Sequence, residues 1–399
     1  MKILIFTASF PPPSAGGSIE YIFNIVSNLP RGSVVVHTSN ADPLKARELD
    51  KSFPQRIIRN SFIIHVQEAL KRRFLVRKLA SLLQYILWPV VGLWLIIRER
   101  PDIIHIGEHN FAGVAARLAQ RLLGIPYIFY TYAEEIPILS KRRLHNKIFL
   151  AILRRANIVI TVSEYTRELL IQIGVSAARI IKILPAVSRN KRFVATSEQV
   201  ETIRRKYNLV NHKVLLTVGA LEERKGHSAV IRALPDLKET FPDLKYIVVG
   251  TGPREKELKQ EVEETGLSRQ VIFTGRTDDI ELSCLYEICD IFIMPHRQIE
   301  TTLDTEGCPT VFLEASAHGK PVIGGNAGGV ADAILDKRTG LIIDGKDARN
   351  VQIAISQLLQ NPDWASALGR AGREYVSHLT PESNAGKVLE LSRALIDKK

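Results

Sequence analysis

Cysteine is scarce in this sequence, which excludes a fold held together by disulfides. The 399 residues include three cysteines, Cys284, Cys289 and Cys308, all in the second half of the chain. An odd and sparse set is not a disulfide framework, and it is typical of a reducing compartment such as the cytoplasm. No group of His and Cys has the spacing of metal ligands, so we expect no bound metal.

The sequence also lacks repeats of solenoid period, low-complexity tracts and nucleic-acid-binding motifs. Its N-terminus, MKILIFTASF, has too short an apolar run for a signal peptide and no cleavage site, so it predicts a strand. Hydrophobic residues make up 45% and charged residues 24% of the chain. A chain of this length and composition predicts two globular domains.

Acidic residues are few in the first half. Residues 1–186 contain 25 Lys and Arg against 12 Asp and Glu, whereas the rest of the chain is nearly neutral. This asymmetry indicates an anionic partner, either a membrane surface or nucleic acid, unless the basic face is merely solvated. The basic clusters have no interleaved aromatic residues for base stacking, which favours an anionic membrane over nucleic acid. These clusters are Lys71–Arg73, Arg77, Lys78, Lys141–Arg143 and Lys147.

One uncharged stretch, Leu79–Ile97, approaches the length of a membrane span. Gln84, Pro89 and Gly92 interrupt it, and a strand is expected directly after Pro101. That strand belongs in a sheet, which favours a buried crossover helix over docking to a bilayer surface or a true span. The three interpretations remain open at the level of the sequence.

Short apolar runs alternate with helical patterns, which predicts parallel sheets covered by helices on both faces. In the first half we expect strands at Lys2–Phe6, Ser33–Thr38, Asp102–Ile106, Tyr127–Thr131 and Ile158–Val162. After a polar segment at 186–200 the expected strands are Lys213–Val218, Tyr246–Gly250, Val271–Thr274, Ile291–Met294, Pro321–Gly324 and Gly340–Ile343. The sequence therefore predicts an α/β protein of two doubly wound, Rossmann-like domains, 1–186 and 187–380, with ligands at the C-terminal ends of the strands. A last helix, Pro381–Asp397, fits either domain.

Two loops that follow predicted strands have the composition of phosphate-binding turns. The first contains Gly16-Gly17 before a helix, where glycine lets a ligand approach the backbone and its free N–H groups, although a simple tight turn explains it equally well. The second ends in Arg224, Lys225 and Gly226, and it places cations at a sheet edge where a phosphate would arrive. A glycine-rich turn at 324–332 is a weaker candidate.

The strongest motif is the segment from Glu306 to Glu314. Pro309 is a natural first helical residue, so the free N–H groups near Thr310 and Val311 would point at a diphosphate. Glu306 precedes this helix and Glu314 lies about one turn into it. Carboxylates accept hydrogen bonds from paired hydroxyl groups, so the segment predicts a nucleotide-sugar site.

Taken in order, the motifs resemble those of the family-4 glycosyltransferases, which have the GT-B fold. The resemblance covers nearly the whole chain and rests on Gly16-Gly17, Asp102-Ile-Ile-His105, Val162-Ser163, Lys225-Gly226, Gly250-Thr-Gly252, the spacing of Glu306 and Glu314, and Gly328-Gly329-Val330. It implies two domains facing a central cleft and retaining transfer of a sugar from a nucleotide donor, with no bound metal or other cofactor. It also implies that the helix at 381–399 joins the first, acceptor-binding domain and that the second domain binds the nucleotide-sugar.

The resemblance assigns Lys225 to the diphosphate, Glu306 to the donor-sugar hydroxyls and Glu314 to the ribose. The other expected donor-site residues are Gly17, Arg224, Gly252, Thr310 and Val311. We expect Glu306, Lys225 and Tyr132 to be catalytic. Tyr132 is included because it stands where the family usually has a histidine that contacts the donor sugar, a contact that Glu134 or His109 could also supply.

Two further departures from the family pattern lie near the expected donor site. Ala220 replaces a frequent arginine, and Cys308-Pro309 replaces an aromatic-glycine pair. We predict a hexosyltransferase that uses a UDP- or GDP-sugar and a lipid or lipid-linked glycan acceptor in cell-envelope synthesis, in the cytoplasm at the inner membrane face. The alternative hypotheses are a binding or scaffold protein that has lost catalysis and a nucleotide-sugar epimerase.

Overall fold

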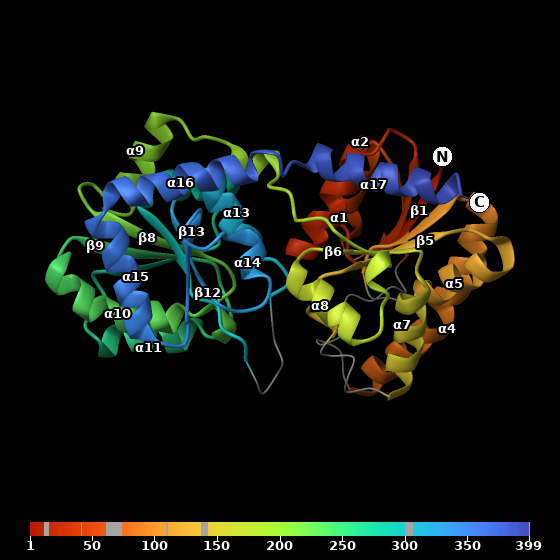
Figure 1. Ribbon diagram of the computed structural model, residues 1–399, viewed down its shortest axis with the longest axis horizontal. Coiled ribbons are helices and arrows are strands. Elements are labelled where there is room, and N and C mark those ends of the chain that lie inside the picture. Colours follow the sequence, from red (N-terminus) through yellow and green to blue (C-terminus); the bar gives the residue numbers. More distant parts are fainter. Residues whose placement is uncertain are drawn as a thin grey trace. The chain divides into compact units, whose positions relative to one another are not determined.

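The computed structural model describes residues 1–11, 16–40, 42–60, 74–108, 111–136, 143–299 and 306–398, without the side chains of 74–86 and 143–145. The chain divides into two compact units (Figure 1). Unit 1 comprises Met1–Ala186 and Pro381–Lys399, and unit 2 comprises Val187–Thr380. Each unit contains one parallel sheet, so the predicted α/β fold class is confirmed.

The sheet of unit 1 has seven parallel strands in the order β3-β2-β1-β4-β5-β6-β7. Its strands are β1 (Ile3–Phe6), β2 (Val34–Ser39), β3 (Arg56–Asn60), β4 (Ile103–Ile106), β5 (Tyr127–Thr131), β6 (Ile158–Thr161) and β7 (Ile180–Lys182). The helices of this unit are α1 (Gly17–Asn28), α2 (Pro43–Ser52), α4 (Phe74–Glu99), α5 (Ala112–Leu123), α7 (Arg143–Arg155), α8 (Glu164–Gln172), the short 3-10 turn η1 (Ala177–Arg179) and α17 (Pro381–Ile396).

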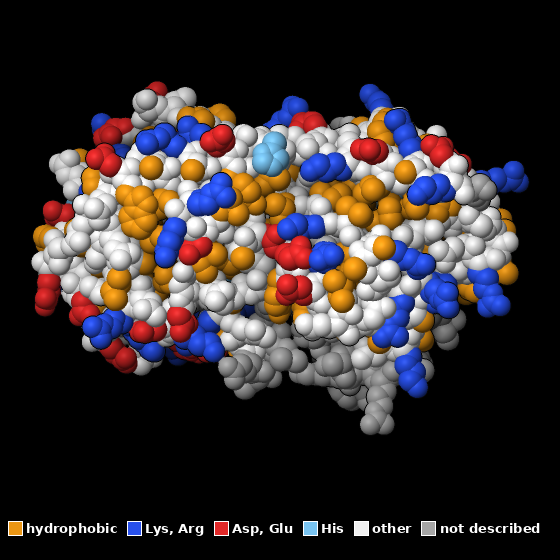
Figure 2. Space-filling view, viewed as in Figure 1, with side chains coloured by type: hydrophobic (Ala, Val, Ile, Leu, Met, Phe, Trp, Pro, Cys, Tyr) orange, Lys and Arg blue, Asp and Glu red, His pale blue; other side chains and the backbone are white. Residues whose placement is uncertain are grey.

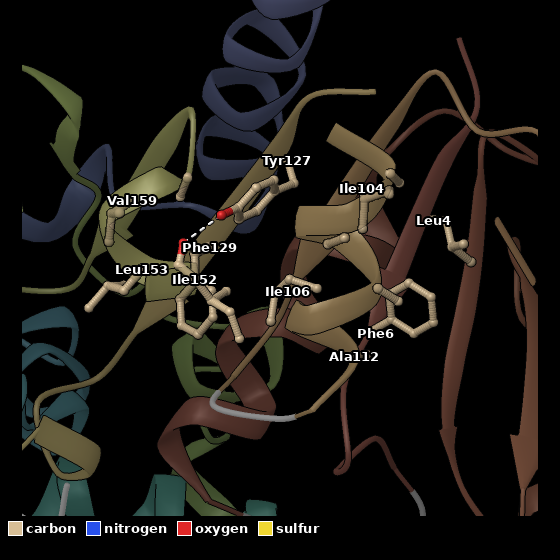
Figure 3. Packing of buried hydrophobic residues seen from close by; sticks show 14 of the residues in the cluster. Leu4, Phe6, Ile104, Ile106, Ala112, Tyr127, Phe129, Ile152, Leu153 and Val159 are labelled. Carbon is tan, nitrogen blue, oxygen red and sulfur yellow. Dashed lines mark hydrogen bonds between the residues drawn. The ribbon is translucent and has the colours of Figure 1, made fainter. Parts of the chain in front are cut away.

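The core of unit 1 forms because the central strands are apolar on both faces, as expected for a sheet covered by helices. Figure 3 shows Phe6, Ile104 and Phe129 from three neighbouring strands in one packed layer. In the same layer the buried hydroxyl group of Tyr127 donates a hydrogen bond to the backbone carbonyl of Ile152 on α7. That bond satisfies the one polar group of the ring inside an apolar core.

The uncharged stretch Leu79–Ile97 lies in α4, the crossover from β3 to β4. In the described part of α4, Trp88, Leu95 and Ile96 are buried in the core of unit 1. Gly92 packs so tightly on α5 that an added Cβ would lie 2.9 Å from the Cβ of Ala115. Among the described residues, no helix is long and apolar enough to cross a membrane. Of the predicted basic clusters, Lys71–Arg73 and Lys141–Arg142 lie outside the described residues, as do the side chains of Arg77, Lys78 and Arg143.

The C-terminal helix α17 packs on α1 in unit 1. Two buried contacts tie it to the sheet region: Ser392 Oγ lies 3.1 Å from His105 Nε2, and Asn384 donates to the carbonyl of Leu184 at 2.8 Å. The chain therefore leaves unit 1 after Ala186, forms unit 2, and returns at Pro381.

The sheet of unit 2 has six parallel strands in the order β10-β9-β8-β11-β12-β13. Its strands are β8 (Lys213–Val218), β9 (Leu244–Val249), β10 (Val271–Gly275), β11 (Ile291–Met294), β12 (Val322–Gly325) and β13 (Gly340–Ile343). Its helices are η2 (Arg189–Arg192), α9 (Ser197–Lys206), η3 (Glu223–Lys225), α10 (His227–Thr240), α11 (Glu255–Glu264), α12 (Asp279–Ile288), α13 (Thr310–Ala317), α14 (Val330–Ala333), α15 (Ala348–Gln360) and α16 (Pro362–Ser377).

Both sheets contain a point at which the strand order reverses. In unit 1 it lies between β1 and β4, and in unit 2 between β8 and β11. Connections that leave two adjacent strands at such a point run in opposite directions and open a crevice at the carboxyl ends of the strands. The residues that follow β1, β4, β8 and β11 are therefore the first candidates for a functional site.

Candidate functional site

Two cations follow the carboxyl end of β8. Arg224 and Lys225 lie in the turn η3, which ends at Gly226 in a left-handed conformation with φ of 77°. A Cβ on Gly226 would lie 2.1 Å from the carbonyl oxygen of Pro295, just after β11, so the position requires glycine. This close approach holds the β8 turn against the segment that follows β11.

The carboxylate of Glu306 binds both cations. Lys225 Nζ lies 2.8 Å from Glu306 Oε2, and the guanidinium of Arg224 contacts the same oxygen. Arg224 also lies 3.0 Å from Glu222. Lys225 is 7% exposed, so its charge is largely removed from water and depends on this carboxylate or on another anion in its place.

His296, which no sequence motif marked, lies beside the same carboxylate. Its Nε2 is 3.7 Å from Glu306 Oε2, and its Nδ1 lies 3.1 Å from the carbonyl oxygen of Met294. Burial, followed by the charges of Lys225 and Arg224, holds the pKa of His296 well below its usual range. The ring is therefore neutral and donates through Nδ1 to the Met294 carbonyl. The sequence signal that could have identified His296 is its position two residues after the predicted strand Ile291–Met294.

The helix α13 begins next to Glu306. It starts at Thr310 with Pro309 as its N-cap, so the prediction that Pro309 is the first helical residue was wrong by one position. The first N–H groups of a helix have no partner within it, which leaves those of Thr310 and Val311 available to an anion. The glycine-rich turn reaches the same place, because Gly329 N donates to the carbonyl of Glu306 at 2.9 Å.

Glu314 lies in the second turn of α13 and is 6% exposed. The hydroxyl group of Tyr286, on α12, donates to Glu314 Oε2 at 2.9 Å. The Tyr286 ring stacks on His318 with 5.2 Å between ring centroids and an angle of 17°. His318 in turn contacts Glu287 at 2.7 Å, and this hydrogen bond lowers the pKa of Glu287. Tyr286 and His318 were not selected from the sequence, because their link to Glu314 is purely spatial.

The structure thus brings Arg224, Lys225 and Glu306 together and places Thr310, Val311 and Glu314 on the helix that follows. Gly252 lies in the loop after β9, where an added Cβ would come within 2.5 Å of the backbone of Leu221. Close packing between two loops is therefore sufficient reason for glycine there. Gly17 and Tyr132 belong to unit 1, and His109 lies outside the described residues.

The predicted site residues of unit 1 follow β1 and β5. The helix α1 begins at Gly17, and an added Cβ there would meet no atom of the described residues within 4 Å. The hydroxyl group of Tyr132 donates to the carbonyl of Gly107 at 2.8 Å. Burial raises the pKa of Tyr132 well above its usual range, so its hydroxyl group stays protonated and engaged with the backbone.

Two carboxyl groups that the sequence analysis did not single out lie at the same edge of unit 1. Glu108, after β4, accepts hydrogen bonds from Thr7 Oγ1 and from the backbone N–H groups of Ala8 and Ser9. Glu135 accepts from the backbone N–H of Tyr132 at 2.8 Å. Burial raises the pKa of Glu108, and it raises that of Glu135 to about 7.

In each unit these residues lie at the carboxyl ends of the strands, which we call the edge of that unit. The chemistry of the two edges differs. The edge of unit 2 presents cations and helix N–H groups, which suit an anion such as a diphosphate. The edge of unit 1 presents carboxyl oxygens, which suit hydroxyl groups. Among the described residues, no group of His, Cys, Asp and Glu is arranged to hold a metal ion.

Two family profiles match the sequence, and together they span most of it. The profile of the glycosyltransferase family 4 matches residues 15–191, and that of the glycosyl transferases group 1 matches residues 199–375. A GDP-mannose-dependent alpha-(1-6)-phosphatidylinositol monomannoside mannosyltransferase from Mycolicibacterium smegmatis is 36% identical over 221 residues, which is 55% of this chain and 57% of that relative. The chain thus matches little more than half the length of this relative.

A second relative is similar along almost its whole length. The GDP-mannose-dependent monoacylated alpha-(1-6)-phosphatidylinositol monomannoside mannosyltransferase from Corynebacterium glutamicum is 27% identical over 381 residues, covering 94% of this chain and 93% of the relative. Among solved structures, HepE from Anabaena in complex with UDP has a TM-score of 0.78 at 19% identity, covering 99% of this chain and all of that chain. The structural similarity shows a common GT-B fold.

Proposed function

The chain belongs to the family-4 glycosyltransferases, and on that premise we propose that it transfers a hexose from a nucleotide-sugar to a lipid or lipid-linked glycan acceptor in cell-envelope synthesis. The observation that carries the proposal is the convergence of Arg224, Lys225 and Glu306 beside the N-terminus of α13. GDP-mannose is the proposed donor, because the names of both mannosyltransferase relatives describe them as GDP-mannose-dependent.

We assign the donor to unit 2. Lys225 and the N–H groups of Thr310 and Val311 hold the diphosphate, Glu306 binds hydroxyl groups of the sugar, and Glu314 binds the ribose. As the bond to the sugar breaks, negative charge develops on the departing diphosphate, and prearranged cations and N–H dipoles stabilise it. Arg224 supplies a second cation at Glu306, which offsets the absence of an arginine at Ala220.

We assign the acceptor to unit 1, where Glu108 and Glu135 offer carboxyl oxygens to its hydroxyl groups. Gly17, at the start of α1, offers the N-terminal N–H groups of that helix to an anion. Tyr132 stands where the family usually has a histidine. We assign it a positioning role, because its hydroxyl group donates a hydrogen bond to the Gly107 carbonyl. Transfer with retention follows from the family and requires no metal or resident cofactor in this proposal. The protein acts at the inner membrane face, held to anionic lipid by its basic unit 1.

The test begins with binding. Isothermal calorimetry with GDP, UDP, GDP-mannose and UDP-glucose should show a preference for the guanine nucleotides; no binding by any of the four would contradict both the transferase and the epimerase hypotheses. Release of GDP from GDP-mannose in the presence of membrane extract then measures turnover.

Glu306→Ala should abolish this release, because the substitution removes the acceptor for the sugar hydroxyl groups and the carboxylate that Arg224 and Lys225 share. Glu257→Ala is the matched control, since Glu257 is an exposed carboxylate of the same unit that pairs with Arg254. Binding of GDP without any turnover in the wild-type protein would support the scaffold hypothesis instead.

A further inference from the structure

Two neighbouring helices of unit 1 expose large apolar side chains to solvent. On α4 these are Leu87, Val90, Trp94 and Ile97, and on α5 they are Leu118, Leu122 and Leu123. We name the four on α4 together with Leu118 and Leu122 the α4–α5 face. Trp94 is 53%, Ile97 68% and Leu122 72% exposed. Exposed side chains of this size seldom gather on a soluble surface unless something covers them.

The six residues lie on two helices that pack against each other. The four on α4 recur at intervals of three and four residues, so they follow one stripe opposite the buried Trp88, Leu95 and Ile96. Both helices connect parallel strands of one sheet and therefore run in the same direction. They are in contact with each other, and Figure 1 shows α4 beside α5. A Cβ added at Gly92 of α4 would lie 2.9 Å from the Cβ of Ala115 on α5. The exposed residues of both helices include one near the C-terminal end, Ile97 on α4 and Leu122 on α5.

The charged side chains that are exposed on α5 and on the described part of α4 are all basic. Arg98, Arg100 and Arg121 are exposed at the C-terminal ends of the two helices. The guanidinium of Arg98 lies 5.0 Å from the ring centroid of Trp94, which keeps a cation directly over the aromatic ring. The one carboxylate in α5 and the described part of α4 is Glu99, and it is buried against Lys2 and Arg56.

The wider surface has the same bias. Unit 1 contains 29 Lys and Arg against 15 Asp and Glu, whereas unit 2 contains 25 against 27. On the face drawn in Figure 2, Lys and Arg predominate over unit 1, and both signs are interspersed over unit 2. The exposed apolar side chains of α4 and α5 therefore belong to the cationic unit.

We propose that the α4–α5 face docks unit 1 on the surface of an anionic lipid bilayer. Trp94, Ile97 and Leu122 enter the boundary between headgroups and acyl chains, and the three arginines bind phosphate headgroups beside them. A second copy of the chain is a poorer occupant, because a two-fold interface through this face would bring the same arginines together. The proposal rests on the proposed function in so far as a lipid acceptor is met at such a surface.

The experiment uses the full chain and acceptor-free vesicles, so its outcome does not depend on glycosyl transfer. Co-sedimentation with phosphatidylglycerol–phosphatidylcholine vesicles should show binding that weakens with added salt, and vesicles of phosphatidylcholine alone should bind far less. Ile97→Gln/Leu122→Gln should lower the partition coefficient at least ten-fold, and Arg121→Gln alone should lower it about five-fold.

The matched control is Leu44→Gln/Ile280→Gln. Leu44 lies on α2 of unit 1 and is 78% exposed, and Ile280 lies on α12 of unit 2 and is 51% exposed. This control should bind vesicles like the wild-type protein, and both double variants should retain GDP binding and thermal midpoint. Brominated lipid should quench the fluorescence of the wild-type protein but not of Trp94→Phe.

Three outcomes would overturn the proposal. The first is absent or salt-independent vesicle binding. The second is an equal loss in the control and the Ile97→Gln/Leu122→Gln variant. The third is a wild-type dimer in sedimentation velocity that the Ile97→Gln/Leu122→Gln variant dissociates, since that would assign the face to a second copy. Failure of GDP binding with vesicle binding intact would instead contradict the proposed function alone.

Discussion

The two units build their strand-order reversals in the same way and fill them with opposite chemistry. In unit 2 the segments after β8 and β11 bring Arg224 and Lys225 to one carboxylate, Glu306. In unit 1 the segments after β1 and β4 bring the carboxyl group of Glu108 to backbone N–H groups and a hydroxyl group. One edge is therefore organised around cations and the other around carboxyl groups.

The sign at each edge is the reverse of the sign of the unit around it. Unit 1 is strongly basic, yet its edge presents Glu108 and Glu135. Unit 2 has slightly more acidic than basic residues, yet its edge presents the buried cation of Lys225 and the partly buried one of Arg224. Net charge therefore indicates what the outer surface of a unit attracts, whereas the few residues at the carboxyl ends of the strands determine what the site binds.

Lys225→Met should give the largest effect, because it removes the buried cation of the unit 2 edge. We expect transfer from GDP-mannose to fall by at least about 100-fold, since prearranged charges at a departing anion contribute on this scale. GDP binding measured by calorimetry should weaken as well.

Lys213→Met is the matched control for Lys225→Met. Lys213 lies at the opposite end of β8, is exposed, and pairs with Asp290. Equal losses of activity in the two variants would show that general charge rather than this edge drives donor binding, and the contrast between the units would lose its basis.

The unit 2 edge could be predicted from the sequence far better than the unit 1 edge, for a physical reason. Lys225-Gly226 and Glu306 to Glu314 are short continuous segments in which a helix start, a cation and a carboxylate are adjacent along the chain. In unit 1, the hydrogen-bond partners of Glu108 lie about 100 positions away along the chain. No local pattern marks such a carboxyl group, and only the pairing of β1 with β4 brings its partners to it.

The same distinction explains the fold. The strands at the centre of each sheet were predicted because buried parallel strands are continuous apolar runs. The edge strand β3 was missed, since Arg56 and Arg59 make it polar, and α2 before it is mostly exposed. Arg59 nevertheless has a structural role there, because it pairs with Asp50 and binds the backbone carbonyl of Pro11.

Tyr286→Phe should give an intermediate effect confined to unit 2. The substitution removes the hydrogen bond that fixes Glu314 but keeps the ring stacked on His318. We expect the KM for GDP-mannose to rise about ten-fold with kcat nearly unchanged, because Glu314 would contact the ribose equally before and during the reaction.

Tyr207→Phe is the control for Tyr286→Phe, since it also removes a tyrosine–glutamate hydrogen bond, to Glu281, in the same unit. This variant should leave both kinetic constants as they are. A fall in kcat with unchanged KM in Tyr286→Phe would mean that Glu314 acts on the reacting bond rather than on the ribose.

Glu135→Gln should give the smallest effect, and it addresses the edge of unit 1 through stability alone. Burial raises the pKa of Glu135 to about 7, whereas an unfolded glutamate titrates near 4.5. Between these values the folded protein binds more protons than the unfolded chain, so stability falls as the pH rises from about 5 to 7. Glutamine is neutral throughout, so the thermal midpoint of the variant should decline less over this interval.

Glu108 and Glu134 also face this edge, and Glu108 has its own raised pKa, so part of the slope should remain in Glu135→Gln. Glu168→Gln is the control, because Glu168 is exposed on α8 of the same unit and its substitution should leave the wild-type slope in place. If the thermal midpoints of Glu135→Gln and the wild-type protein changed equally with pH, burial would not raise the pKa of Glu135, and this carboxyl group would be ionised and solvated in the folded protein. The unit 1 edge would then present ordinary solvated charge, and its contrast with the buried Lys225 of unit 2 would be one of exposure rather than of chemistry.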